Sequence, residues 1–495
     1  MNQLAKKTAT GAIINISVTL FKNLAQFLII IPILARILTP EQFGLIAMAM
    51  TLVGFLTTFH DLGISAALVR AEKPTAAFWS SGFWLNFGFG TLMTVLAYFS
   101  APWVAAFFGE PLVEELVRLM SCVLFLHCIF LVPMAWLQRN LKFQTIAVID
   151  LAAILISSTV AIVLALNGCG VWALAWQQIL LYAVKAIAGM LLHKAPIRFV
   201  FEWAPIKAVL PFSLGLTGTA FVGFLNRNTD NVLIGRFLGA DALGFYDRAY
   251  LMMRMPMKTL SSGLNFALYP ALSAVQSDKG KLGTAYLKTV SVLSVLVFPM
   301  MTGLAVVVVP FVDLLFGSQW GPVAPVLGIL AFVGLLQSVG SIANEVWKAR
   351  GRSGLLLRWS LIRSAVFIIA FSIGVYIGTL EAIAMAYLIA NVILLVPFQY
   401  ELIKELNISV SAMLAAVRAQ FLSSLAMAAA VLVVKGMFPG IESLNSTLQL
   451  LILVPVGVMA YGGAMVVFFK SFIRSTFEDY KMLRRSGDSS APAVA

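Results

Sequence analysis

Long apolar stretches alternate with short polar segments along nearly the whole chain. A helix needs about 20 apolar residues to cross a bilayer, and reading the sequence at that width predicts about fourteen membrane-spanning helices. They lie near 12–35, 43–63, 80–107, 112–135, 144–166, 170–193, 211–237, 241–272, 287–311, 322–347, 355–378, 380–400, 413–434 and 447–469. No connecting segment is long enough to fold as a separate domain.

Two sequence echoes divide this pattern into similar halves. Ala35-Arg36-Ile37-Leu38 runs into Gly44 and Ala49, and 200 positions later Gly235-Arg236-Phe237-Leu238 runs into Gly244 and Ala249. More weakly, Trp136 and Arg139 recur as Trp347 and Arg350. Each echo is an even number of helices apart, so the halves should share one orientation, as in a parallel repeat about an axis normal to the membrane.

The repeat predicts a domain organisation. We expect an N-lobe of six helices, an interfacial linker, a C-lobe of six helices, two additional helices and a cytoplasmic tail, at 1–193, 194–210, 211–412, 413–470 and 471–495 respectively.

Composition decides the class of protein. Of the 495 residues, 61% are hydrophobic and 11% are charged, and the mean hydropathy is +0.95. So little polar surface cannot cover a soluble globule. The sequence therefore predicts an all-α integral membrane protein with two parallel-repeat lobes.

The basic residues predict the orientation. With the N-terminus inside, about 23 of the Lys and Arg residues fall on cytoplasmic segments, whereas Arg36, Arg236 and Lys435 fall outside. Both termini should therefore be cytoplasmic. The net charge of +13 is explained by this asymmetry, so no nucleic-acid partner is expected.

Eight basic residues lie inside the predicted spans, where a charge on a helix costs about 2.5–3.5 kcal/mol. They are Lys22, Arg118, Lys185, Arg227, Arg248, Arg254, Lys258 and Arg363. Arg118 follows Glu114 by one turn, which favours a surface ion pair, and Lys185 can extend toward the cytoplasmic interface. Cations that face a watery cavity would indicate an anionic passenger.

Polar side chains form helical stripes in three of the spans. The first stripe comprises Asn15, Thr19, Lys22, Asn23 and Gln26; the second is Asn226 to Asn231; the third comprises Asp247, Tyr250, Arg254, Lys258, Ser261 and Asn265. The first and third lie on one face of their helices, and the second is a continuous run near the outer half of its span. Together they indicate a shared cavity. The predicted substrate-binding residues are Lys22, Asn23, Gln26, Arg227, Asn228, Arg254, Lys258, Asn265 and Arg363.

Five acidic residues are candidates for coupling to an ion or a proton: Asp61, Asp150, Asp230, Asp247 and Glu345. The alternative is that they pair with cations and hold helices together, as Asp230 with Arg227 or Asp247 with Arg254 would. The sequence does not separate these interpretations.

Motifs for catalysis are missing from the sequence. It contains no Walker loop, nucleophile elbow, HExxH or paired carboxylates, and the three cysteines, Cys122, Cys128 and Cys169, lack metal-ligand spacing. We therefore expect a transporter without cofactor or metal, and not an enzyme.

Several short motifs occur in a specific order. They are Leu38-Thr39-Pro40-Glu41-Gln42-Phe43-Gly44, Gly168-Cys169-Gly170-Val171-Trp172-Ala173-Leu174, Asp230 with Ile234-Gly235, Leu238-Gly239, Leu243-Gly244-Phe245-Tyr246, and Phe316-Gly317 with Trp320 and Pro325-Val326-Leu327. Because of these motifs, the chain resembles the Wzx-type polysaccharide-repeat flippases of the MOP superfamily, most closely the colanic-acid-exporter-like branch. The resemblance extends to about residue 400.

The resemblance implies a MATE-like carrier of fourteen helices in the bacterial inner membrane. It would move undecaprenyl-diphosphate-linked oligosaccharide units to the periplasmic leaflet by alternating access, for exopolysaccharide, lipopolysaccharide or capsule synthesis. It also implies coupling to an ion gradient, contact with membrane lipids, and polymerase and export components as partners.

Three other interpretations stay open at the level of sequence. The first is a lipid II flippase, whose substrate is equally anionic. The second is a drug and cation antiporter, which would be expected to have an acidic cavity. The third is a polymerase or ligase of the same pathway, which would be expected to have a large external loop.

Overall fold

The computed structural model describes residues 18–468 apart from 19, 60, 62, 73 and 275–277, and omits the side chains of 205, 208, 210–216, 219, 257–274 and 353. Every regular element in this described part is helical. The elements are a π-helical turn η1 (Gln26–Ile30), α2 (Ile31–Ile37), α3 (Pro40–Thr57), α4 (Ile64–Arg70), α5 (Ala76–Phe108), α6 (Leu112–Arg139), α7 (Phe143–Leu166), α8 (Val171–Leu192), α9 (Trp203–Ala274), α10 (Lys279–Val306), α11 (Val308–Phe316), η2 (Ser318–Trp320), α12 (Val323–Ala349), α13 (Ser353–Ile377), α14 (Leu380–Glu405), α15 (Val410–Met437), η3 (Pro439–Ile441) and α16 (Ser446–Phe468).

The helices confirm the predicted all-α membrane fold. Within the described residues, twelve helices are long and apolar enough to cross a membrane. The other two predicted spans, near 211–237 and 241–272, are the two arms of α9, which carry the charged stripes. The arms meet at Gly239, whose φ of 85° favours glycine. The structure therefore has two helical arms, as predicted, but they meet at a single kinked glycine and are not separated by a loop.

Other boundaries differ from the expected ones. The span predicted to run to residue 63 ends at Thr57. The short helix α4 then begins at Ile64, after Gly63 with a φ of 71°. The first span contains the π-helical turn η1, in which one extra residue is accommodated within a helix.

Contacts within the chain define two compact units. Unit 1 comprises Met1–Gly263, Leu315–Val326 and Leu357–Ala390; unit 2 comprises Leu264–Leu314, Leu327–Leu356 and Asn391–Ala495. The predicted division into lobes at 193 and 211 stays a prediction.

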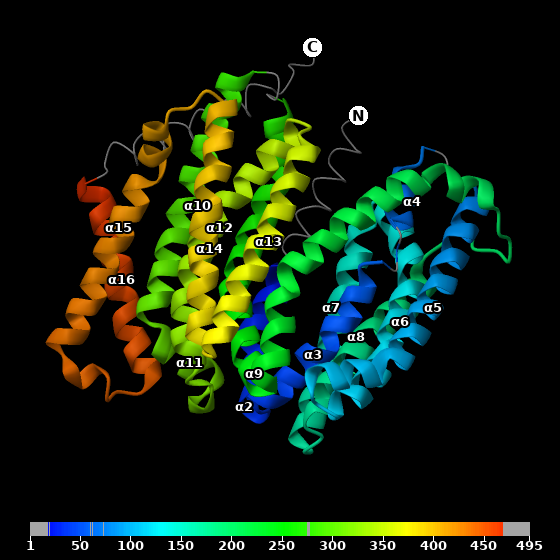
Figure 1. Ribbon diagram of the computed structural model, residues 1–495, viewed down its shortest axis with the longest axis horizontal. Coiled ribbons are helices and arrows are strands. Elements are labelled where there is room, and N and C mark those ends of the chain that lie inside the picture. The colour runs from blue at the N-terminus through cyan, green and yellow to red at the C-terminus, as the bar shows by residue number, and fades with distance from the viewer. Residues whose placement is uncertain are drawn as a thin grey trace, which may run out of the picture. The chain divides into compact units, whose positions relative to one another are not determined.

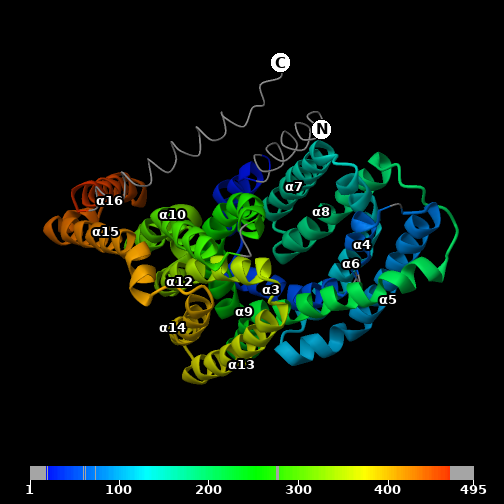
Figure 2. The same cartoon turned by 90° about the horizontal axis from the view of Figure 1, so that it is seen from above.

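In unit 1, α5 to α8 lie side by side, as Figures 1 and 2 show. Aromatic residues of α5 pack on α4 and α6 in one apolar core that contains Leu68, Trp79, Phe83 and Val132. Helices with one apolar face are stabilised by this kind of burial.

The segment between α8 and α9 is docked on α5. Ser80 Oγ donates to the carbonyl of Pro196 (3.0 Å) and accepts from the backbone N–H of Arg198 (2.9 Å). The Trp84 indole N–H donates to the carbonyl of Arg198 (2.8 Å). The predicted linker 194–210 is therefore extended only up to residue 202, because α9 begins at Trp203.

Arg139 holds the end of α4. Its guanidinium donates to the carbonyls of Val69 (2.9 Å) and Glu72 (2.8 Å), and also to those of Leu68 and Ala71. These carbonyls lie at or just beyond the end of α4, where a helix leaves acceptors unsatisfied.

We expect Arg139→Ala to destabilise this corner of the protein. Hydrogen bonds from a charged donor contribute about 1.5–3 kcal/mol each, and the variant loses several of them at once. Limited proteolysis of the membrane-embedded protein should cut near residues 70–75 faster than in the wild type. The control is Lys142→Ala, which removes only a cation–π contact with Trp136 at 4.9 Å. Equal cleavage of Arg139→Ala and wild type would contradict the prediction.

The two copies of the sequence echo meet in unit 1 in a reciprocal contact. A Cβ atom on Gly44 would lie 1.8 Å from the carbonyl oxygen of Ala240, and one on Gly244 would lie 2.0 Å from that of Pro40. Residues 200 positions apart thus exchange roles, as a parallel repeat requires. The contact is between backbones, and only glycine permits it.

Other contacts lie beside this close approach. Arg36 Nε donates to the carbonyl of Leu315 (3.4 Å), while Arg236 lies over the Phe107 ring at 5.7 Å. The buried Trp320 donates to the carbonyl of Ala35 (2.8 Å) and packs edge to face on Phe43 (5.4 Å between centroids). Together these contacts surround the close approach of the two echoes.

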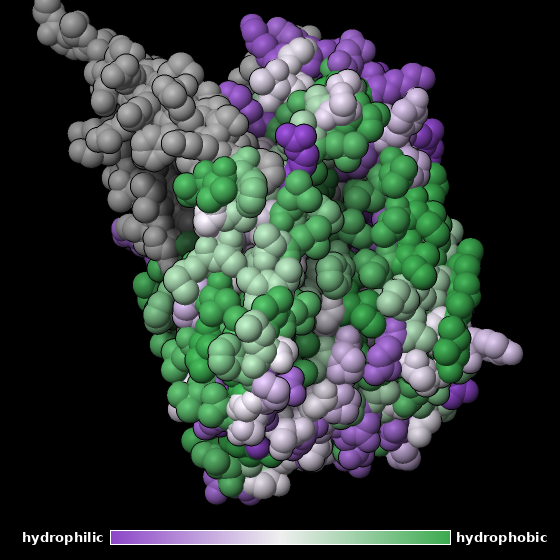
Figure 3. Space-filling model, turned by 90° about the vertical axis from the view of Figure 1, so that its left-hand side faces the viewer, coloured by the Kyte–Doolittle hydropathy of each residue, from purple (hydrophilic) through white to green (hydrophobic). Residues whose placement is uncertain are grey.

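In unit 2, α10, α15 and α16 pack together (Figure 1). Gln420 in α15 is buried and donates to the carbonyl (3.0 Å) and hydroxyl (2.9 Å) of Ser291 in α10. Figure 3 shows that hydrophobic side chains cover the middle of the face over α15 and α16, and that polar ones gather toward its ends. This distribution suits contact with lipid.

Candidate functional site

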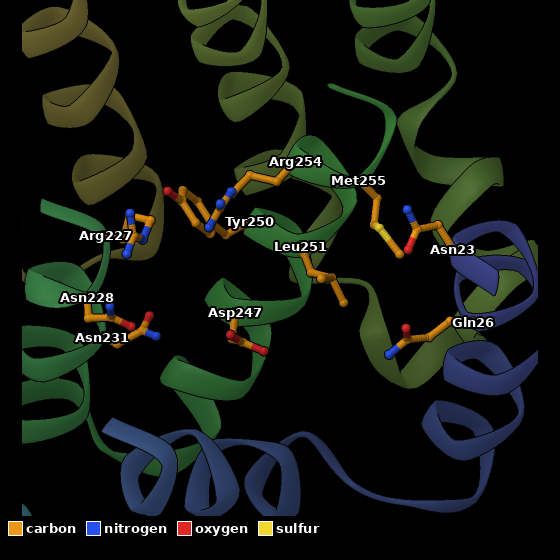
Figure 4. A pocket seen from close by; sticks show the side chains of 10 residues that line it. All are labelled: Asn23, Gln26, Arg227, Asn228, Asn231, Asp247, Tyr250, Leu251, Arg254 and Met255. Atoms are coloured by element: carbon orange, nitrogen blue, oxygen red, sulfur yellow. The ribbon is translucent and has the colours of Figure 1, made fainter. Parts of the chain in front are cut away.

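A cavity of about 310 Å³ lies in unit 1 and is mostly polar. Three segments line it, as Figure 4 shows: the first helix and the two arms of α9. The lining residues are Asn23, Gln26, Arg227, Asn228, Asn231, Asp247, Tyr250, Leu251, Arg254 and Met255. All three predicted stripes therefore contribute to one cavity.

Helical spacing explains this lining. Residues 247, 250, 251, 254 and 255 recur every three or four positions and share one face of the second arm of α9. Residues 227, 228 and 231 do the same on the first arm. Gln26 is the first residue of the π-helical turn η1, and Asn23 lies three residues before it.

Two guanidinium groups dominate the cavity. Arg254 lies over the Tyr250 ring, with 5.4 Å between Cζ and the ring centroid, and Figure 4 shows Arg227 on the other arm. Both side chains are exposed rather than buried. No carboxylate among the described residues forms an ion pair with either, so their charge is available to a ligand.

The acidic residues nearby have other partners. Asp247 lines the cavity but pairs with its neighbour Arg248, whose Nε lies 3.1 Å from Oδ2. Asp230 is only 3% exposed and accepts from the Tyr246 hydroxyl (3.1 Å) and the Asn231 N–H (2.9 Å). The pairings considered from sequence, Asp230 with Arg227 and Asp247 with Arg254, are absent from the described residues.

Lys22 is not among the cavity-lining residues. Its Nζ lies 3.2 Å from Asp150 Oδ2, and Lys185 Nζ lies 2.8 Å from the other oxygen, Oδ1. Each side chain of this Lys–Asp–Lys triad is about one fifth exposed, at 19%, 22% and 19%. The carboxylate of Asp150 therefore forms ion pairs with two ammonium groups.

Two further coupling candidates are engaged locally. Asp61 accepts from the Ser65 hydroxyl (2.6 Å) and backbone N–H (3.1 Å) at the start of α4. Glu345 pairs with Lys348 at 2.7 Å. The expected surface pair of Arg118 with Glu114 is confirmed, at 2.7 Å. Whether any of the five acids couples transport to an ion stays a prediction.

Of the remaining predicted binding residues, only Arg363 has a described side chain, and it is not among the lining residues. Arg363 is half-buried in α13. Lys258 and Asn265 belong to α9, but their side chains lie outside the described part of the structure. Five of the predicted binding residues do line the cavity: Asn23, Gln26, Arg227, Asn228 and Arg254.

The list of candidates from sequence omitted four lining residues. Asn231 and Tyr250 belong to the recognised stripes, so their position was available from the spacing. Leu251 and Met255 line the cavity four residues apart, and apolar side chains give no signal of such a role in a membrane helix.

Comparison with known proteins places the chain among polysaccharide biosynthesis proteins. The model of the family described as "Polysaccharide biosynthesis protein" matches residues 33–325. The chain is 29% identical over 472 residues to the succinoglycan biosynthesis transport protein ExoT of Rhizobium meliloti, covering 94% of this chain and 93% of that protein. It is 28% identical over 401 residues to the lipopolysaccharide biosynthesis protein WzxC of Escherichia coli, covering 79% and 80%.

Solved structures share the fold. The lipid II flippase MurJ in an inward closed conformation superposes with a TM-score of 0.72 at 15% identity, covering 94% of this chain and 99% of that one. An inward-facing MATE family multidrug transporter of the MOP superfamily superposes with a TM-score of 0.57 at 16% identity, covering 79% and 99%.

Proposed function

Since the chain belongs to the polysaccharide biosynthesis protein family, whose model spans residues 33–325, we propose that it is a flippase for lipid-linked oligosaccharides. Its substrate is an undecaprenyl-diphosphate-linked repeat unit, which it moves from the cytoplasmic to the periplasmic leaflet of the bacterial inner membrane. It acts by changing the side from which the cavity is accessible, and not as an enzyme.

One observation carries this proposal: Arg227 and Arg254 face the cavity, and the carboxylate that lines it, Asp247, is engaged by Arg248. A diphosphate cannot cross hydrocarbon unaided, because removing its charges from water is too costly. Guanidinium groups replace part of its hydration and bind phosphate oxygens through paired donors. Arg254, held over Tyr250, is positioned for this role.

The remaining lining suits a sugar. Asn23, Gln26, Asn228 and Asn231 supply amide donors and acceptors that match sugar hydroxyls. Tyr250 offers an aromatic face. The polyprenyl chain needs no polar site, and we expect it to remain in lipid while the headgroup crosses.

The alternatives fit the cavity or the relatives less well. A cationic drug would be repelled by two arginines that no described carboxylate neutralises. A lipid II flippase would also need cations, and the likeness to MurJ is one of fold. The relatives ExoT and WzxC are named for succinoglycan and lipopolysaccharide synthesis, which favours an oligosaccharide repeat unit.

Orientation and partners belong to the same proposal. The positive-inside pattern supports cytoplasmic termini. Polymerase and export components of the pathway would receive the product in the periplasm.

The test is transport by the purified protein. Reconstituted in proteoliposomes, it should move a fluorescent undecaprenyl-diphosphate-linked oligosaccharide between leaflets, measured by quenching from outside. Lipid II and a cationic dye serve as competing substrates. Movement of the dye without movement of the oligosaccharide would refute the proposal.

A further inference from the structure

The Lys–Asp–Lys triad has a surplus of positive charge. Lys22 and Lys185 contribute two charges, and Asp150 neutralises one of them. Among the described residues, no other carboxylate forms an ion pair with either lysine. An uncompensated charge within a membrane protein is costly and generally has a function.

The triad lies within the membrane-spanning part of unit 1. Asp150 is seven residues from the start of α7, and Lys185 is seven residues from the end of α8. At 1.5 Å per residue both are about 10 Å from those helix ends. On the predicted topology both ends are cytoplasmic, so the triad lies on the side from which the substrate enters.

Its surroundings keep the lysines in place. Lys185 Nζ lies 5.7 Å from the centroid of the Phe130 ring, a cation–π distance. Ile149 and Ala186, the chain neighbours of Asp150 and Lys185, are buried in one apolar cluster with Phe130. The apolar packing fixes one side of the triad, whereas each of its three side chains remains about one fifth exposed, at 19%, 22% and 19%.

The first helix links the triad to the cavity. Lys22 immediately precedes Asn23, which lines the cavity, and consecutive Cα atoms are about 3.8 Å apart. Their side chains point about 100° apart on the helix, so Lys22 reaches Asp150 beside the cavity lining and not within it. For a ligand whose diphosphate binds Arg227 and Arg254, we place the triad at the flank of the glycan, near Asn23.

We propose that Lys22 and Lys185 form a second anion subsite, which binds a carboxylate on the glycan of the substrate. With the carboxylate bound, two ammonium groups face two carboxylates, and the surplus charge is neutralised. The preferred substrate is then an acidic repeat unit. This inference rests on the proposed function, because it assumes that a lipid-linked glycan occupies the cavity.

Two probes that differ in one group test the subsite. They are undecaprenyl-diphosphate-linked disaccharides whose second sugar is either glucuronic acid or glucose. Purified full-length protein in proteoliposomes should move the acidic probe faster. Lys185→Gln leaves a neutral Lys22–Asp150 pair, so it should slow the acidic probe roughly tenfold and leave the neutral probe within about twofold.

Further variants exclude a purely structural effect. Lys185→Arg should keep most of the preference, since it preserves the charge. Asp150→Asn raises the net charge and should lower KM for the acidic probe only. Arg118→Gln removes a cation that already has its own carboxylate and should change neither rate.

The outcomes separate this subsite from the proposed function. If Lys185→Gln slows both probes equally, or neither, the subsite is refuted while the flippase stands. If wild type moves neither probe, the proposed function fails, and the subsite fails with it. A monodisperse size-exclusion profile for each variant shows that a lost rate is not a lost fold.

Discussion

Replacing Arg254 with Gln should lower flipping of a lipid-linked oligosaccharide roughly 10- to 100-fold. Each hydrogen bond from a charged donor contributes about 1.5–3 kcal/mol, which corresponds to that range. Gln keeps part of the side-chain length but lacks the charge. Arg227→Gln should act in the same direction, and the double variant should be the slowest, measured as polymer export in cells and as flipping in proteoliposomes.

The control is Arg118→Gln, because Arg118 is paired with Glu114 at 2.7 Å and does not line the cavity. Arg254→Lys should recover part of the activity, since it restores a charge but not the two parallel donors. Normal export by the double variant, at a normal protein level, would remove both arginines from the site.

Replacing Gly44 or Gly244 with Val should abolish transport. Even the first carbon of a side chain would lie 1.8 Å or 2.0 Å from a backbone oxygen, and backbone atoms cannot move aside as a flexible side chain can. Overpacking costs about 1–3 kcal/mol in tolerant cores, and this contact offers no room to relax. We expect the two backbones to separate at the end of the protein that the basic residues place outside.

Separation can be measured by chemical labelling. With Asn231→Cys in the cavity lining, a membrane-impermeant maleimide added outside should react faster when Gly44→Ala is also present. The same protein without Asn231→Cys gives the background from the three native cysteines. Gly462→Ala is the matched control, because no atom lies within 4 Å of its added carbon. Unchanged labelling would show that the contact does not close the cavity.

The sequence was sufficient where local periodicity controls the outcome. Arg227 and Arg254 reach the cavity because they lie on polar faces of two helical arms, and Arg118 pairs with Glu114 within one helix. Twelve of the predicted spans followed from apolar length. The boundary between the spans predicted near 211–237 and 241–272 was less clear, because a single glycine with a positive φ, Gly239, joins the two helices without a loop.

Partners far apart in the chain were beyond this reasoning. Lys22 was predicted to face the cavity, and its pairing with Asp150 joins residues 128 positions apart. A stripe on one helix shows which direction is polar but not which helix lies opposite. Asp230 likewise pairs with a tyrosine rather than an arginine, because packing, and not charge alone, selects the neighbour.

The π-helical turn at Gln26–Ile30 gives the first helix one residue more than an ordinary α-helix would hold between the same flanks. Deleting one residue from the turn should therefore restore an α-helix and leave the directions of Lys22 and Asn23 nearly unchanged. The same deletion in a regular part of the helix would rotate the preceding side chains by about 100°. The turn is thus the place where the length of this helix can change while its polar stripe keeps its direction.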